Sequence, residues 1–271
     1  NQDFISYLEN KNFIIPSQTH GNYPLTFLAL SSSLNMKYLN EQKDQFDTRD
    51  KAQSTGHKLI NDNEVMKNFK AKGYKIISFD SGSWLTNSIK IADWNLCGTN
   101  NLDSEFVGMI VRTTMLNPIH VRLLENDIRE GILCIFDELP LLKERTDKPI
   151  FVFAHILIPH PPYIFGANGQ SVETESLSLT EGWDDREGYT NQIHFANKKI
   201  KDLLNEMLSD DYSPVIIIQS DHGPRGSVDW ENPDNVMIKR LYGILNAYHL
   251  PDDGNKEIYE TISPINSFRI V

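Results

Sequence analysis

Residues 215–223 have the sequence VIIIQSDHG, in which an apolar run leads directly into Asp221, His222 and Gly223. Four successive β-branched residues are typical of a strand buried on both faces of a sheet. A carboxylate and an imidazole at the end of such a strand offer an oxygen and a nitrogen, which suit Zn²⁺ or Mn²⁺. Gly223 would let the backbone bend away sharply. The alternative is a plain turn in which Asp221 accepts hydrogen bonds from backbone amides.

A second apolar run, Pro149–Ile158, also predicts a buried strand and leads into the sequence HILIPHPPY at residues 155–163. His155 lies inside the run, where a lone histidine is more often a satisfied core residue. His160 follows the run between prolines, which restrict the backbone and leave the ring few alternatives. A ring held in this way suits binding of an anionic oxygen or donation of a proton. The alternative is a rigid turn with an incidental histidine.

A third polar segment precedes an apolar stripe of helical spacing at residues 25–39. Helix N-termini bind phosphate and sulfate readily because their N–H groups are unpaired. The hydroxyl candidates in this segment are Ser17, Thr19 and Thr26. Hydroxyls at helix starts are usually only caps. Arg225, four residues beyond Asp221, could clamp an anion with two hydrogen bonds, although surface arginines usually do not.

The order of these patterns favours an α/β fold. Helical patterns cover residues 2–12, 25–39, 63–72, 104–146 and 189–208, and strand patterns cover 13–15, 74–79, 149–158 and 215–219. We expect residues 40–57 to be a polar, mobile excursion, and residues 80–103 and 159–185 to be loops. Helices alternating with strands predict a doubly wound, mostly parallel sheet flanked by helices, within one domain of residues 1–271. Ligands gather at the carboxyl ends of such strands, where both histidine-containing segments lie.

Composition narrows the class of protein. The chain has 271 residues, 39% of them hydrophobic, and a net charge of −11, which indicates a soluble globular protein and argues against nucleic-acid binding. Cys97 and Cys134 belong to no CxxC pair, which excludes a zinc ribbon and a disulfide-rich scaffold but leaves a single disulfide open. No apolar run approaches the roughly 20 residues that span a bilayer.

Four segments in this order resemble the alkaline phosphatase and sulfatase superfamily, most closely the sulfatase-like envelope proteins related to lipoteichoic acid synthase. Residues 13–36 are similar to its nucleophile loop and helix, and residues 63–82 to the helix and strand that follow. Residues 151–165 are similar to its strand with a substrate-side histidine, and residues 189–225 to its final helix and strand. The similarity covers most of the chain, and its specificity comes from four modest motifs in the right order.

The resemblance implies a metal-dependent hydrolase or transferase that acts on phosphate or sulfate esters. Asp221 and His222 would hold a divalent ion (Mn²⁺, Zn²⁺ or Ca²⁺), and His160, His155 and Arg225 would contact the ester oxygens. The reaction would be a displacement at phosphorus or sulfur. The substrate would be carried on an envelope glycan or lipid. The domain would face outward at the extracytoplasmic side of the cell membrane, attached through segments that precede this chain.

Two departures from the family pattern affect these expectations. The nucleophile position falls on Asn22, an amide and a poor nucleophile, with Thr19 as the candidate if the loop is offset. Water would then attack, or the protein would be a catalytically silent binding protein. The family's first strand, whose Asp completes the metal site, has no counterpart, so we expect a chain truncated at both ends and an incompletely coordinated ion. A third interpretation, an unrelated α/β binding domain, requires all four similarities to be accidental.

Overall fold

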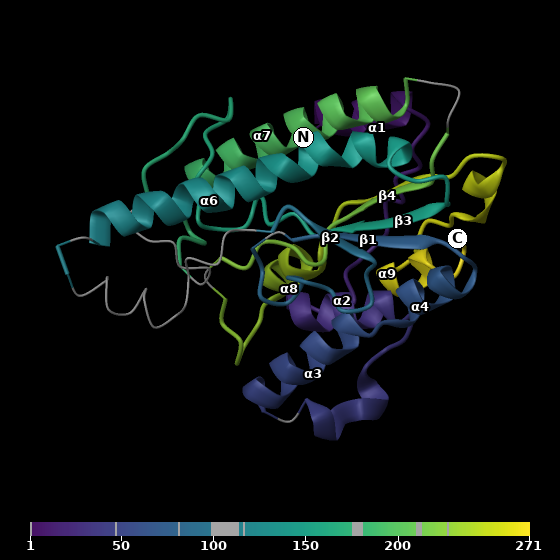
Figure 1. The fold of residues 1–271 in the computed structure, drawn as a ribbon. Coiled ribbons are helices and arrows are strands. Elements are labelled where there is room, and N and C mark those ends of the chain that lie inside the picture. Colours follow the sequence, from purple (N-terminus) through teal and green to yellow (C-terminus); the bar gives the residue numbers. More distant parts are fainter. Residues whose placement is uncertain are drawn as a thin grey trace. The chain divides into compact units, whose positions relative to one another are not determined.

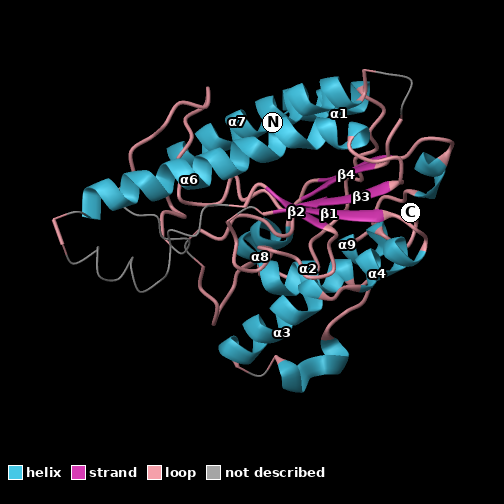
Figure 2. Ribbon diagram, viewed as in Figure 1, coloured by secondary structure: helices cyan, strands magenta, loops and turns pink. Residues whose placement is uncertain are grey.

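The computed structural model describes residues 2–46, 48–80, 82–98, 114–115, 117–174, 181–209, 213–226 and 228–271. The chain forms two compact units (Figure 1). The first unit consists of residues 1–73 and 204–271, and the second consists of residues 74–203. The elements alternate as an α/β fold requires, as Figure 2 shows by colour.

The first unit contains a pair of antiparallel strands, β4 (Ile216–Gln219) and β5 (Asn246–His249). Ile216 pairs with His249 and Gln219 pairs with Asn246. The sequence predicted β4 but not β5. The predicted strand at residues 13–15 is reduced to one bridge, in which Ile14 pairs with Tyr248. All four residues of β5 are buried, whereas those of β4 are half-buried.

The first unit also contains six helices among the described residues. They are α1 (Gln2–Asn10), α2 (Thr26–Leu34), α3 (Arg49–Asn61), α4 (Glu64–Ala71), α8 (Asn235–Tyr242) and α9 (Pro264–Ser267), with short 3₁₀ turns at Asn40–Gln45 and Gly254–Glu257. Helix α2 packs on both α3 and α9. The close approach of α2 and α3 depends on Gly56, because a Cβ there would lie 2.9 Å from Cβ of Phe27.

The expectation of a mobile excursion at residues 40–57 was wrong. Thr48 caps α3, since its side chain accepts a hydrogen bond from the backbone N–H of Lys51. Ala52, Gly56 and Ile60 are buried and recur every four residues, so they form one face of the helix. Two of these three residues have almost no hydrophobic side chain, which is why the stripe escaped notice in the sequence.

The second unit contains a parallel sheet of three strands in the order β2-β1-β3. Its strands are β1 (Lys75–Phe79), β2 (Trp94–Leu96) and β3 (Ile150–Ala154). Lys75 pairs with Ile150, and Phe79 pairs with Ala154. The sequence predicted β1 and β3, although β3 ends sooner than the apolar run. It missed β2, which lies in a predicted loop.

Two long helices, α6 (Asn117–Glu138) and α7 (Arg186–Met207), belong to the second unit, apart from the last turn of α7. They lie alongside one another on one side of the sheet (Figure 1). Ile132 and Phe136 of α6 pack with Phe195 of α7, while Ile135 packs on Phe79 of β1. The 3₁₀ turn Leu139–Glu144 continues α6. Of the helix predicted at residues 104–146, residues 104–113 lie outside the described part of the chain.

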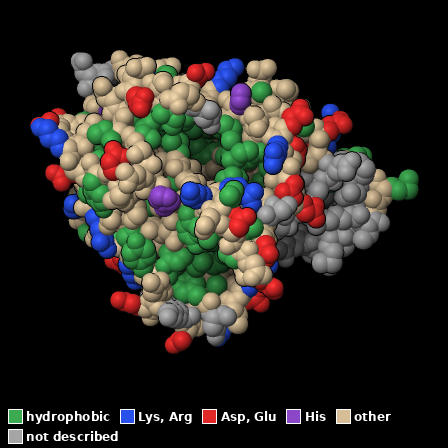
Figure 3. Space-filling view, turned by 180° about the vertical axis from the view of Figure 1, so that it is seen from behind, with side chains coloured by type: hydrophobic (Ala, Val, Ile, Leu, Met, Phe, Trp, Pro, Cys, Tyr) green, Lys and Arg blue, Asp and Glu red, His purple; other side chains and the backbone are tan. Residues whose placement is uncertain are grey.

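The observed architecture confirms a mixed α/β fold with a parallel sheet flanked by helices. That residues 1–271 form one domain stays a prediction. Among the described residues, no helix is both long and apolar enough to cross a membrane. On the face drawn in Figure 3, Lys and Arg side chains are interspersed with Asp and Glu.

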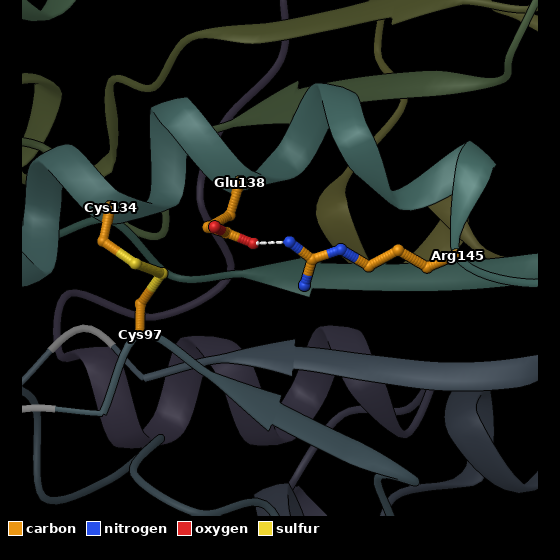
Figure 4. Close-up of a disulfide and its surroundings, with 4 residues drawn as sticks. All are labelled: Cys97, Cys134, Glu138 and Arg145. Carbon is orange, nitrogen blue, oxygen red and sulfur yellow. Dashed lines mark hydrogen bonds and ion pairs between the residues drawn. A yellow bond between two sulfur atoms is a disulfide. The ribbon is translucent and has the colours of Figure 1, made fainter.

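A disulfide joins Cys97, just beyond β2, to Cys134 in α6, with Cα atoms 5.7 Å apart (Figure 4). The sequence left open whether the two cysteines form a disulfide, and the structure shows that they do. One turn further along α6, Glu138 forms an ion pair with Arg145, so covalent and ionic links both hold this end of the helix. The two cysteines that the bridge joins are 37 residues apart in the sequence.

Removing the bridge should lower stability, because a cross-link reduces the entropy of the unfolded chain. We expect the Cys97→Ser/Cys134→Ser variant to lose about 3–4 kcal/mol of unfolding free energy in urea titrations. The native protein treated with reductant should match the variant, and the variant itself should not respond to reductant. Equal midpoints for the oxidised and reduced native protein would contradict a bridge that stabilises the second unit.

Candidate active site

Asp221 and His222 present their side chains side by side at the carboxyl end of β4. Oδ2 of Asp221 lies 3.5 Å from Nε2 of His222, and their side chains are 22% and 6% exposed. Two ligands bound about 2.0–2.1 Å from one tetrahedral ion are separated by roughly 3.3–3.5 Å. The donor atoms are therefore spaced as two ligands of one metal ion would be, and the residues fit the metal that the sequence predicted.

The tautomer of His222 is fixed by its own backbone neighbour. Its Nδ1 lies 2.8 Å from the carbonyl oxygen of Gly223. A carbonyl can only accept, so Nδ1 carries the proton and donates it. The lone pair of the ring is then on Nε2, the atom that faces Asp221. This is the arrangement of metal-binding histidines, which donate their other N–H to a carbonyl or carboxylate.

Gly223 is required for a close approach rather than for an unusual φ angle. A Cβ at this position would lie 1.8 Å from the carbonyl oxygen of Arg240. The backbone N–H of Gly223 also donates to the carbonyl of Leu241 at 2.8 Å. Gly223 has no positive φ. The glycine therefore lets the turn after β4 lie directly on the end of α8.

Thr26, the first residue of α2, places its hydroxyl against His222. Its Oγ1 lies 3.2 Å from Nε2 of His222 and donates to that lone pair. The sequence placed Thr26 among the hydroxyl candidates but did not select it. Nothing in the spacing of the motifs connects residue 26 with residue 222, so only the fold reveals their contact.

The loop that contains Asn22 also lies against Asp221. A Cβ on Gly21 would be 3.3 Å from the carbonyl oxygen of Asp221, and the N–H of Gly21 donates to the carbonyl of Tyr242 at 2.8 Å. Oδ1 of Asn22 accepts a hydrogen bond from the backbone N–H of Ile265 at 3.2 Å, in the first turn of α9. The amide of Asn22 thus helps to cap a short helix.

The loop that contains Asn22 is hydrogen-bonded to residues 260–265, and each bonded pair is separated by 243 residues in the sequence. The bonded pairs are Ser17 with Glu260, Thr19 with Ile262 and Asn22 with Ile265. The two hydrogen bonds that Ser17 donates lower the pKa of Glu260. Thr19 is 8% exposed, and its hydroxyl donates to Ile262 and accepts from Asn246. Those bonds favour a structural role for Thr19.

Arg225 is half-buried near the Asp221 carboxylate. Burial lowers the pKa of its guanidinium, the charge of Asp221 raises it, and Arg49 lowers it again. Its backbone carbonyl accepts a hydrogen bond from Arg240 at 2.8 Å. Within the described residues, no group of three His, Cys, Asp or Glu side chains could hold a metal ion. Among the described residues, the candidate metal site therefore offers two side chains, Asp221 and His222.

The other predicted site residues, His155 and His160, belong to the second unit. His155 follows β3 directly, and its Nδ1 lies 3.1 Å from Oγ1 of Thr86. His160 has its Nδ1 against the carbonyl of Pro161, which leaves Nε2 as the acceptor nitrogen. Its ring meets the ring of Trp183 edge to face, with centroids 4.5 Å apart. The two histidines therefore have different partners within this unit.

Gln192 holds the segment that carries His160, a role that the sequence did not suggest. This side chain is fully buried in α7. Its amide nitrogen donates to the carbonyl of His160 at 3.0 Å. Its amide oxygen accepts from the N–H groups of Ile164 and Phe165 at 3.1 and 3.4 Å. One side chain thus satisfies three backbone groups of the turn that follows His160.

A buried carboxylate, Asp80, was also missed by the sequence analysis. It follows β1 as His155 follows β3, after the paired residues Phe79 and Ala154. Asp80 is 8% exposed, and its Oδ1 accepts from the N–H of Gly82 at 3.0 Å. Burial raises its pKa more than this hydrogen bond lowers it. A single Asp after a strand carries no signal in sequence, because such residues commonly cap turns.

Comparison with known protein families shows which family this chain belongs to. A model of the sulfatase family matches residues 1–256. The chain belongs to the sulfatase family. That match runs through both units. No curated protein sequence matched, so the relationship rests on the family pattern and on the fold.

Several solved structures share this sulfatase fold. The periplasmic domain of EptC from Escherichia coli, in complex with Zn, has 14% identity and a TM-score of 0.60, over 98% of this chain and 72% of that one. EptA from Neisseria meningitidis, an integral membrane phosphoethanolamine transferase, has 11% identity and a TM-score of 0.59, over 98% of this chain. This chain spans 48% of the length of EptA. Ps i-CgsB, in complex with a neocarrahexaose, has 12% identity and a TM-score of 0.52. At these identities the likeness shows the fold alone.

Asp80→Asn should stabilise the protein at neutral pH. The raised pKa means that the folded state favours the neutral carboxyl of Asp80. The stability that this preference adds is fully present at pH values below the ordinary pKa of 3.8, and it is lost as the pH rises through the folded pKa. Asn keeps the acceptor for Gly82 without the buried charge. We expect a melting temperature higher by roughly 1–3 °C near neutral pH and no gain below the ordinary pKa. Asp202→Asn, at an exposed position of α7, is the control, and an unchanged or lower melting temperature would contradict the argument.

Proposed function

We propose that this chain is a metal-dependent hydrolase or transferase that acts on phosphate or sulfate esters. The observation that supports it most directly is the pairing of Asp221 Oδ2 with His222 Nε2, 3.5 Å apart, in a sulfatase-family chain. A bound divalent ion would supply a Lewis acid that stabilises negative charge on the ester oxygens. Asp221 and His222 would hold it, and the carbonyl of Gly223 would keep the His222 lone pair directed at it.

Other residues would bind and orient the ester. Arg225 would bind its anionic oxygens through N–H donors of the guanidinium. In the second unit, His160, and His155 with it, would contact anionic ester oxygens, and a protonated His160 would donate to a leaving oxygen. Gln192 would keep the His160 turn in one conformation, because three hydrogen bonds join it to that turn.

The attacking group is the least conventional part of this proposal. An amide such as Asn22 is a poor nucleophile, and its oxygen is already hydrogen-bonded to Ile265. Thr19 has its hydroxyl engaged within the protein. We therefore infer that water attacks, or that Thr26, which contacts His222, takes the place of the missing nucleophile. A second candidate function is a catalytically silent binding protein, and the capping role of Asn22 favours it.

The extracytoplasmic face of the cell membrane is the proposed location. The Cys97–Cys134 disulfide supports it independently of the family, because such bonds persist in oxidising compartments. The likeness to a periplasmic domain and to an integral membrane transferase points the same way. Membrane attachment would come from segments beyond this chain, and the ester would be carried on an envelope glycan or lipid. Nucleic acid is not a proposed partner.

Metal binding tests the ligand assignment. We expect isothermal calorimetry to detect weak binding of Zn²⁺ or Mn²⁺, because two side chains alone rarely hold an ion tightly. Asp221→Ala or His222→Ala should weaken it by at least about tenfold. His194→Ala, which removes an exposed imidazole from α7, should leave it unchanged. Tight binding that survives Asp221→Ala would refute the assignment.

A trapping experiment tests the attacking group. During turnover of an aryl phosphate, intact-protein mass spectrometry should detect no covalent phospho-enzyme if water attacks. A phosphoryl group on Thr26 that is absent from Thr26→Val and kept in Thr26→Ser would assign that hydroxyl as the nucleophile. Trapping on Thr19 or Ser17 would show that the loop is offset from the register proposed here. Measurable metal binding without turnover of any phosphate or sulfate ester would favour the silent binding protein.

A further inference from the structure

Thr86 is a fully buried residue of the second unit whose hydroxyl contacts a candidate site residue. Its side chain is 0% exposed. The turn that carries it follows β1, and the N–H groups of Thr86 and Asn87 both donate to the carbonyl of Ser83, at 3.0 and 2.9 Å. Leu85 and Ile89, on either side of Thr86, are buried as well. The backbone that carries this hydroxyl is therefore held firmly.

The hydroxyl of Thr86 lies against the half-buried ring of His155. Strands β1 and β3 are paired, with Phe79 opposite Ala154, so the segments that leave these two strands begin side by side. Oγ1 of Thr86 lies 3.1 Å from Nδ1 of His155, although 69 residues separate them in the sequence. The orientation of the ring therefore depends on this contact.

The distance alone permits two arrangements of the ring proton. Either the hydroxyl donates to the lone pair of Nδ1 and the proton is on Nε2, or Nδ1 carries the proton and donates to the hydroxyl oxygen. The first arrangement is favoured, because a ring nitrogen is a much better acceptor than a hydroxyl oxygen. Imidazole takes up a proton at a pH of about 6.5, whereas an alcohol does so only in strong acid. A neutral histidine side chain in water also prefers its proton on Nε2.

The other two candidate histidines have the opposite tautomer. Nδ1 of His160 donates to the carbonyl of Pro161, and Nδ1 of His222 donates to the carbonyl of Gly223, because a carbonyl can only accept. Their lone pairs are on Nε2, as a metal ligand or a base requires. His155 differs from both because its partner is a hydroxyl. With its proton on Nε2, a neutral ring can donate to an anionic oxygen without first taking up a proton.

We propose that Thr86 is a positioning residue that keeps the proton of His155 on Nε2, so that the neutral ring donates a hydrogen bond to an anionic oxygen of the ester. His160 then has a different role, since its neutral form presents a lone pair and binds such an oxygen only after protonation. The bond from Thr86 to His155 does not depend on the proposed function. Only the donation to the ester rests on it.

NMR of the native protein reads the two tautomers directly. We would record long-range ¹H–¹⁵N spectra of the histidine rings at a pH of about 8.5, where rings with the ordinary pKa of about 6.5 are neutral. The signals are assigned by their loss in His155→Gln and His160→Gln. We expect the protonated nitrogen to be Nε2 in His155 and Nδ1 in His160. A proton on Nδ1 of His155 would overturn the proposal, and this result needs no variant of Thr86.

Variants of Thr86 show whether its hydroxyl is the donor. Thr86→Val replaces the hydroxyl with a methyl group of similar size. It should move the Nδ1 signal of His155 downfield, because a lone pair that accepts no hydrogen bond resonates there. Thr86→Ser should restore the native position. Thr190→Val removes an exposed hydroxyl from α7 and is the matched control, which should leave His155 unchanged. An Nδ1 signal that is the same in Thr86→Val and in the native protein would overturn the assignment of the donor.

Orthophosphate separates this inference from the proposed function. Its addition should move the Nε2 signal of His155, and the affinity read from that signal should fall roughly threefold to tenfold in Thr86→Val and recover in Thr86→Ser. If phosphate leaves a correctly protonated His155 unmoved, the donation to the ester is wrong while the bond from Thr86 stands. If the proton is on Nδ1, the inference is wrong while the proposed function stands.

Discussion

The first unit depends on a buried hydrogen-bond network centred on Asn246 and Tyr248. The amide nitrogen of Asn246 donates to Thr19 and to the hydroxyl of Tyr248, at 3.2 and 2.7 Å. That hydroxyl lies 2.7 Å from Oγ of Ser267, which donates to Gln219 at 2.9 Å. The Asn22 loop, both strands and α9 are thus tied together. Because polar groups in an apolar interior are costly when left unpaired, the network admits few alternative arrangements.

In the second unit, a single buried side chain holds a polar loop in place. Gln192 binds the backbone on both sides of Pro161 and Pro162, and so orders the turn that follows His160. In each unit, a fully buried amide side chain positions a loop that carries candidate site residues. Gln192 both donates and accepts, whereas Asn246 only donates, because its Oδ1 has no hydrogen-bond partner within the described residues. Neither amide carries a charge. The polar loops can therefore be held firmly without burying an ion.

The sequence predicted the parts of this fold that bury large side chains. The apolar runs of β1, β3 and β4 and the Asp221-His222 pair were visible because their signals are local. Helix α3 was not, since two of its inward-facing residues are Ala52 and Gly56. Strand β2 has only three residues, and β5 has the mixed sequence NAYH, which forms no apolar run. Thr26, Asp80 and Gln192 acquire their roles only from partners that lie far away in the sequence.

The constant offset of 243 residues between the Asn22 loop and the C-terminal segment has a consequence for timing. Ser17, Thr19 and Asn22 are synthesised well before their partners Glu260, Ile262 and Ile265, which follow them by 243 residues. Contacts between such distant segments carry a large entropic cost and form late in folding. The nascent chain thus leaves the ribosome with the Asn22 loop still unanchored. Its candidate site acquires a defined shape only after residue 265 has emerged.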